Sequence, residues 1–194
     1  MAFTMPVWKS IKRLALALGL ILVATPAIAQ PGEFSVDEIN PRVEDNLLAV
    51  DARIEYALGD TVIEALENGV ELVITQTLRL ERKRWWWSNA TVINQQRRYR
   101  LQYHAISRRY VLTRLANGDS RSFRNLDSLL ARLGNIEAWP VIHDDQLNAS
   151  GHYDVVLMTQ LELDTLPRLL RTVALVNADW KLRSPSVSHS VVLP

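Results

Sequence analysis

A run of three cations followed by three tryptophans, at residues 82–87, is the chemically most distinctive part of this sequence. Tryptophan combines an apolar ring with a polar N–H group, which suits a protein interface or a wet membrane surface, and cations beside it attract anionic lipid or an acidic partner. We therefore predict an interaction surface here, extended by basic residues of the strand that follows. The predicted surface consists of Arg82, Lys83, Arg84, Trp85, Trp86, Trp87, Arg98, Arg100 and His104.

The same residues also allow a purely structural interpretation. Residues 30–78 contain eleven acidic residues and two arginines, whereas residues 79–114 contain ten basic residues and one glutamate. If the two parts form adjacent strands, their charges neutralise each other across the sheet. Two of the three tryptophans would then close the open end of the core, since aromatic clusters more often belong to a core than to a binding site.

Residues suited to catalysis or metal binding lack the expected arrangement. His104 has no partner that would make it a catalytic base. His143 and His152 lie nine residues apart around Asp144 and Asp145, which matches no zinc or calcium motif, so we expect a surface loop there. No phosphate-binding loop or dinucleotide fingerprint occurs. The sequence predicts no catalytic residues, no cofactor and no metal, and it favours a non-catalytic protein without excluding an enzyme.

The first 29 residues have the pattern of a secretory signal peptide. Cations precede an apolar run at residues 14–24, and Ala27 and Ala29 provide the small residues that signal peptidase recognises before Gln30. The run of 11 residues is shorter than the roughly 20 that span a bilayer. We therefore predict export through the secretory pathway, to the periplasm of a Gram-negative bacterium.

The composition of the remaining chain excludes several classes of function. The absence of cysteine excludes disulfides, thiolate chemistry and a lipid attached at the cleavage point. Residues 30–194 have the length of a single globular domain. Without the leader the chain has nineteen basic and twenty-one acidic residues, a formal charge of −2. An exported, slightly acidic protein is not expected to bind nucleic acid.

Alternating apolar and polar residues predict several half-buried strands joined by short connections, which favours antiparallel pairing. We expect an α+β fold, mainly antiparallel β, with a sheet or sandwich of about seven or eight strands and two or three short helices. Asn125 is a candidate helix cap, Trp139-Pro140 a candidate turn, residues 180–183 a candidate closing strand, and the tail after it is expected to be loose. The clearest alternation covers residues 48–58, 70–81, 93–105 and 153–163.

Several landmarks occur in a characteristic order along the chain. They are Ala65-Leu66, Asn68-Gly69-Val70, Tyr103-His104, Ser107, Tyr110, Ser122-Phe123, Leu133-Gly134, Trp139-Pro140, Leu166-Pro167, Trp180, Leu182 and Ser184. In this the sequence resembles a family of exported proteobacterial proteins known as domain of unknown function 4390. It departs from the family pattern at residues 191–194, where Val-Val-Leu-Pro replaces aromatic residues. The resemblance implies export and one domain, and it brings no established activity.

We thus expect a non-catalytic protein-binding or accessory module of the cell envelope. Its partner is expected to be an envelope protein, with peripheral contact to an anionic membrane as a further option. The alternative is a carrier of a small ligand, or an enzyme, that uses a cavity between sheet and helices.

Overall fold

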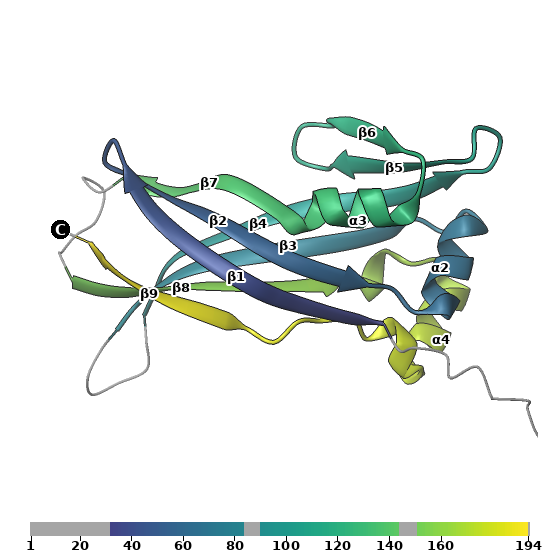
Figure 1. Cartoon of the computed structure of the whole chain (residues 1–194). Helices are drawn as coiled ribbons and strands as arrows, with labels where there is room; N and C mark the ends of the chain where they lie inside the picture. Colours follow the sequence, from purple (N-terminus) through teal and green to yellow (C-terminus); the bar gives the residue numbers. More distant parts are fainter. Residues whose placement is uncertain (1–31, 84–89, 144–150, 194) are drawn as a thin grey trace, which may run out of the picture.

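Antiparallel strands dominate the structure, a computed structural model that describes residues 32–83, 90–143 and 151–193 (Figure 1). Within these residues, nine strands form two sheets and three short α-helices accompany them. The expected α+β, mainly antiparallel fold class is confirmed, with nine strands where seven or eight were expected. The predicted leader, residues 1–29, and the tryptophans at residues 85–87 lie outside the described residues.

The larger sheet has six strands, with β3 and β8 at its centre. Both are buried along most of their length. Thr75 of β3, on the face that alternation predicts to be polar, is only 2% exposed, and its hydroxyl donates a hydrogen bond to Glu162, which also binds Arg98. The strand order is β6 (Ser120–Phe123), β5 (Arg109–Arg114), β4 (Ala90–His104), β3 (Leu72–Arg82), β8 (Gly151–Leu161) and β9 (Val187–Leu193).

The smaller sheet has the order β1 (Glu33–Glu44), β2 (Leu47–Ala57) and β7 (Asn135–His143). Trp139 and Pro140 lie inside β7, so the predicted turn at this dipeptide is wrong. Among the described strands β7 pairs only with β2, and a proline is tolerated on such an edge strand. Ala138 has a φ of 42° and the pairing register shifts nearby, so β7 lacks the regular alternation of a strand.

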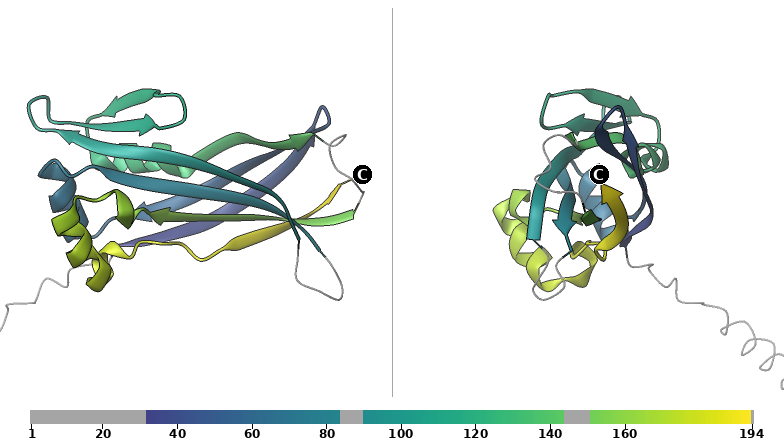
Figure 2. Two further views of the ribbon diagram at one scale, coloured as in Figure 1. Left: turned by 180° about the vertical axis from the view of Figure 1, so that it is seen from behind. Right: turned by 90° about the vertical axis from the view of Figure 1, so that its left-hand side faces the viewer.

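The core lies between the two sheets, which face each other in the end-on view of Figure 2. Apolar side chains of both sheets belong to one continuous cluster, because alternation turns one side of each strand inward. Members that are at most 1% exposed include Phe34, Val50, Leu78, Leu101 and Leu157.

The helix α3 (Leu126–Gly134) lies between the two sheets, against β2 and β5. The predicted cap is confirmed, because the Asn125 side chain accepts a 2.9 Å hydrogen bond from the backbone N–H of Ser128. Leu129 and Leu133 are buried beneath the helix. Gly134 approaches β2 so closely that an added Cβ would lie 2.0 Å from the carbonyl oxygen of Ile54.

The other two helices, α2 (Asp60–Glu67) and α4 (Arg168–Val176), lie at one end of the molecule (Figure 1). Two single 3-10 turns, η2 (Leu163–Thr165) and η3 (Ala178–Trp180), flank α4. Of residues 180–183, only Arg183 pairs, by an isolated bridge to Gln160, so the predicted closing strand is wrong. The tail expected to be loose forms β9 instead. None of the described helices is long and apolar enough to span a membrane.

The two sheets meet along a seam between β4 and β7. The strand β5 pairs with β4 over residues 99–104, so residues 90–97 pair only with β3 among the described strands. Side chains bridge the gap. The Gln95 Nε2 atom donates to the carbonyl of Val141 at 2.9 Å, and the Trp139 Nε1 atom donates to Gln95 Oε1 at 2.7 Å. A polar clamp therefore holds the sheets together where no backbone ladder does.

Candidate anion-binding pocket

The predicted basic and aromatic surface is only partly described. Arg84, Trp85, Trp86 and Trp87 lie outside the described residues. Arg82 and Lys83 stand at the end of β3, and Lys83 forms an ion pair of 3.1 Å with Asp154 and donates to Ser190 at 2.9 Å. His104 is exposed at the opposite end of the sheet, as the last residue of β4.

The remaining two predicted residues, Arg98 and Arg100, lie far from Lys83. Strand pairing places Arg98 opposite Thr75, seven residues along β3 from Arg82, a separation of about 23 Å at roughly 3.3 Å per residue. Arg98 Nε binds Glu162 at 2.8 Å, and Arg100 binds Glu71 at 3.3 Å. The described members therefore spread along the sheet, and carboxylates neutralise three of them.

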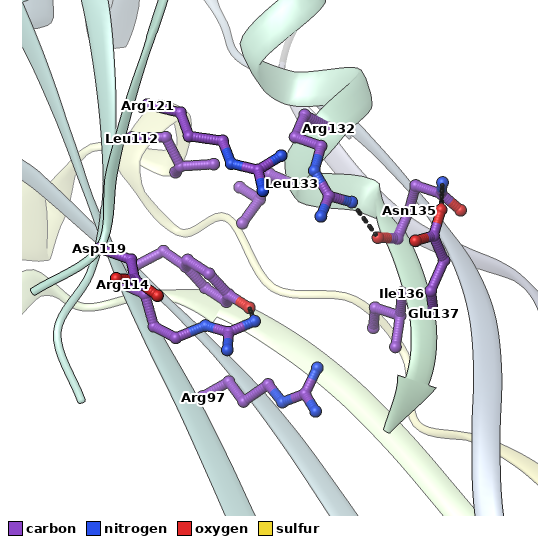
Figure 3. Close-up of a pocket in the computed structure, with 11 residues that line it drawn as sticks. Arg97, Leu112, Arg114, Asp119, Arg121, Arg132, Leu133, Asn135, Ile136 and Glu137 are labelled. Atoms are coloured by element: carbon purple, nitrogen blue, oxygen red, sulfur yellow. Dashed lines mark hydrogen bonds between the residues drawn. The ribbon is translucent and has the colours of Figure 1, made fainter. Parts of the chain in front are cut away.

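A different set of arginines surrounds a pocket of about 200 Å³ (Figure 3). The pocket lies where the seam between β4 and β7 reaches the hairpin β5–β6 and the end of α3. Its cationic lining residues are Arg97 of β4, Arg114 of β5, Arg121 of β6 and Arg132 of α3.

Arg97 points into the molecule because of its place in β4. Tyr99 and Leu101 occupy the inward face of the strand, and Arg97 is in phase with them. Its guanidinium lies 4.0 Å from the ring centroid of Trp139, a cation–π geometry. Burial lowers the pKa of Arg97 below its ordinary value, but an arginine in a protein stays protonated. Arg97 is thus a partly desolvated positive charge above the Trp139 ring.

The other three arginines come from elements that close the pocket. The Arg114 Nη2 atom donates to the hydroxyl of Tyr99 at 3.3 Å. The Arg132 Nη1 atom donates to the backbone carbonyl of Asn135 at 3.3 Å. Figure 3 shows Arg121 and Arg132 on one side of the pocket, and Arg97 and Arg114 on the other.

The charges around the pocket are unbalanced. Asp119 and Glu137 line it, but within the described residues neither forms an ion pair with an arginine of the pocket. Glu137 accepts instead from Asn135 Nδ2 at 2.8 Å, and Asp119 accepts from Asn117. Guanidinium groups present planar pairs of donors that match carboxylate and phosphate oxygens. The arrangement can hold an anion.

The sequence contained one usable signal for this pocket. The alternation of β4 that predicts Tyr99 on the inward face also places Arg97 there, and an inward cation is unusual enough to mark a site. No comparable signal exists for Arg121 and Arg132, because their approach depends on tertiary packing. Across residues 32–83, 90–143 and 151–193, no group of His, Cys, Asp and Glu side chains could hold a metal ion.

Comparison with known proteins gives one match. A family model with the description "Domain of unknown function (DUF4390)" matches residues 32–190, which include the arginine pocket and both sheets except the last three residues of β9. No curated protein and no solved structure matches the chain. Because the match covers most of the sequence, it confirms the resemblance predicted from the landmark residues, and the chain belongs to the DUF4390 family.

Proposed function

We propose that this protein is a non-catalytic binding module of the cell envelope, and that its arginine pocket holds an anionic group of an envelope protein. The leader predicted at residues 1–29 supports export to the periplasm of a Gram-negative bacterium. The observation that supports binding is the convergence of four arginines without a carboxylate partner among the described residues.

The size of the pocket limits what enters it. Its volume of about 200 Å³ lies below the roughly 300–1,000 Å³ of pockets that enclose a whole drug-sized ligand. One carboxylate or phosphate group fits this scale. The remainder of the ligand then lies outside, over the exposed residues of β6 and the rim at Asp119. A protein that presents an acidic side chain or its terminal carboxylate meets both conditions.

Thermal unfolding tests anion binding directly. A ligand that binds only the folded state at about 100 times its Kd adds about 2.7 kcal/mol of stability. For a domain of this length the melting temperature should rise by about 5–10 °C. We expect that rise with inorganic phosphate, relative to sodium chloride of equal ionic strength.

Two variants separate pocket binding from a general salt effect. The pair Arg114→Gln and Arg121→Gln removes two pocket cations, and we expect it to abolish the phosphate-specific rise. The matched control Arg98→Gln removes a cation that is paired with Glu162, outside the pocket, and should leave the rise intact. An equal rise in all three proteins would show that phosphate acts through exclusion from the surface and not through the pocket.

Site-specific photo-crosslinking in cells tests for a protein partner. A crosslinking amino acid at Asp119, on the pocket rim, should capture one envelope protein, whereas the same group at Thr91, an exposed residue of β4, should capture none. Capture from Trp86 and not from Asp119 would favour the basic and aromatic surface predicted from the sequence over the pocket.

The carrier of a small anionic ligand is the second candidate function, because the pocket lies between the larger sheet and α3, where the cavity of such a carrier is expected. Native mass spectrometry of the protein purified from the envelope fraction distinguishes the two. A retained small anion that is lost in the Arg114→Gln, Arg121→Gln protein would support the carrier.

A further inference from the structure

The outward face of α4 is apolar. Leu169 is 88% exposed and Val176 is 81% exposed, with Val173 and Leu175 more than half exposed. Leu169, Val173 and Val176 are spaced i, i+4 and i+7, so they form one stripe along the helix. Ala174 is the only buried residue of α4. The helix therefore turns its larger aliphatic side chains to the solvent.

The other two helices behave in the opposite way. α2 buries Val62 and Leu66, and α3 buries Leu129 and Leu133. Single exposed aliphatic residues are normal on a protein surface, whereas several together indicate a contact surface. In Figure 2, α4 lies at one end of the molecule, beyond the ends of the long strands.

The charges of α4 itself are positive. The helix carries Arg168 and Arg171 and no acidic residue, and Arg168 is exposed. The acidic residues at this end belong to α2, which carries Asp60, Glu64 and Glu67, and to Asp179, which accepts a hydrogen bond from Thr61 of α2. An apolar stripe beside exposed cations is the combination that binds the surface of an anionic bilayer.

The chain also enters the structure at this end. Gly32, just before β1, lies so close to Leu182 and Gly59 that an added Cβ would be 2.9 Å from a Leu182 methyl group.

We propose that α4 docks on the surface of an anionic phospholipid bilayer, with its stripe at the boundary of headgroups and acyl chains. At about 1.5 Å per residue, nine residues are about 14 Å long, which suits a helix lying in the interface. A second copy of the chain is disfavoured, because one short helix offers far less than the roughly 800 Å² per partner of a stable dimer. This docking surface is independent of the arginine pocket.

The absence of cysteine from the whole chain allows a position-specific test. The full chain with Val173→Cys is labelled with an environment-sensitive fluorophore and mixed with vesicles of phosphatidylcholine and phosphatidylglycerol, 3:1. The matched control is Val43→Cys in β1, where the valine is also exposed, at 43%. We expect a blue shift and a several-fold gain of emission at position 173 only, weakened by salt.

Other outcomes overturn the proposal. No change at position 173, or equal changes at both positions, would show that α4 does not contact lipid specifically, even if the apolar run at residues 14–24 brings the chain to the vesicles. A change at position 173 that grows with protein concentration without vesicles would show self-association instead. The exposed residues Leu169 and Val176 provide a second variant, because changing both to serine should reduce the vesicle response at least tenfold while leaving the melting temperature unchanged.

Discussion

The hydrogen bonds that Gln95 forms between the two sheets predict that its replacement lowers the folding stability by more than an ordinary surface substitution does. Gln95 accepts from the indole of Trp139 at 2.7 Å and donates to the carbonyl of Val141 at 2.9 Å. Gln95→Ala leaves both groups without a partner, and each unsatisfied buried group costs about 1–3 kcal/mol. Because Gln95 is itself only half-buried, water restores part of this loss, and we expect about 2 kcal/mol in all.

Chemical and thermal unfolding measure this effect. A loss of about 2 kcal/mol should lower the melting temperature by about 4–8 °C in a domain of this length. The control is Gln96→Ala, one residue along β4, where the side chain is exposed and has no hydrogen bond within the described residues. If the two variants agree within about 0.5 kcal/mol, the usual range for surface substitutions, the clamp does not hold the sheets together.

Two further variants test other contacts. Gly134→Ala forces a Cβ against the carbonyl of Ile54, so we expect α3 to shift from β2 and urea unfolding to show a loss of about 3 kcal/mol. Burial by itself raises the pKa of Glu162, but hydrogen bonds from Arg98 and Thr75 and the charge of Arg98 lower it overall. The free energy that the ionised Glu162 contributes to folding is fully present above the unfolded pKa of about 4.3 and is lost as the pH falls through the lower pKa of the folded state. Melting temperatures measured at a series of pH values should therefore fall less steeply below about pH 5 in the Glu162→Gln protein than in the original protein.

Periodicity predicted the strands with one apolar face and failed for the irregular ones. The alternation at residues 48–58 and 93–105 corresponds to β2 and β4. β7 was missed because Ala138 in the left-handed region and Pro140 interrupt its pattern. β9 was missed because most of its residues are exposed, so it has no strong apolar alternation.

The sequence also predicted only some of the ion pairs. The ion pair of Arg100 with Glu71 follows the structural interpretation of the segregated charges, because the two residues lie on neighbouring parts of the sheet. The partner of Arg98, Glu162, comes from beyond β8 and could not be found from the sequence. Alternation gives the face of a residue but not its neighbouring strand. This is also why Arg121 was not connected with Arg97.

The interior next to the pocket is polar, which argues that the arginines are not a chance gathering on the surface. Strand pairing places Thr159, Gln76 and Arg97 side by side across β8, β3 and β4. Gln76 is fully buried and donates to the hydroxyl of Tyr56 at 3.0 Å, while its Oε1 atom has no hydrogen-bond partner in the part of the chain that the structure describes.

A row of buried polar side chains lowers the stability of the fold relative to a row of apolar side chains. Buried polar groups of this kind are often found at functional sites. Burial raises the pKa of Tyr56 to about 12, so its hydroxyl stays neutral. The row therefore provides hydrogen bonds but no negative charge to balance Arg97. Asp119 and Glu137 bring two negative charges to a pocket with four arginines, so the anion that we propose there would pair with guanidinium groups that have no carboxylate partner among the described residues.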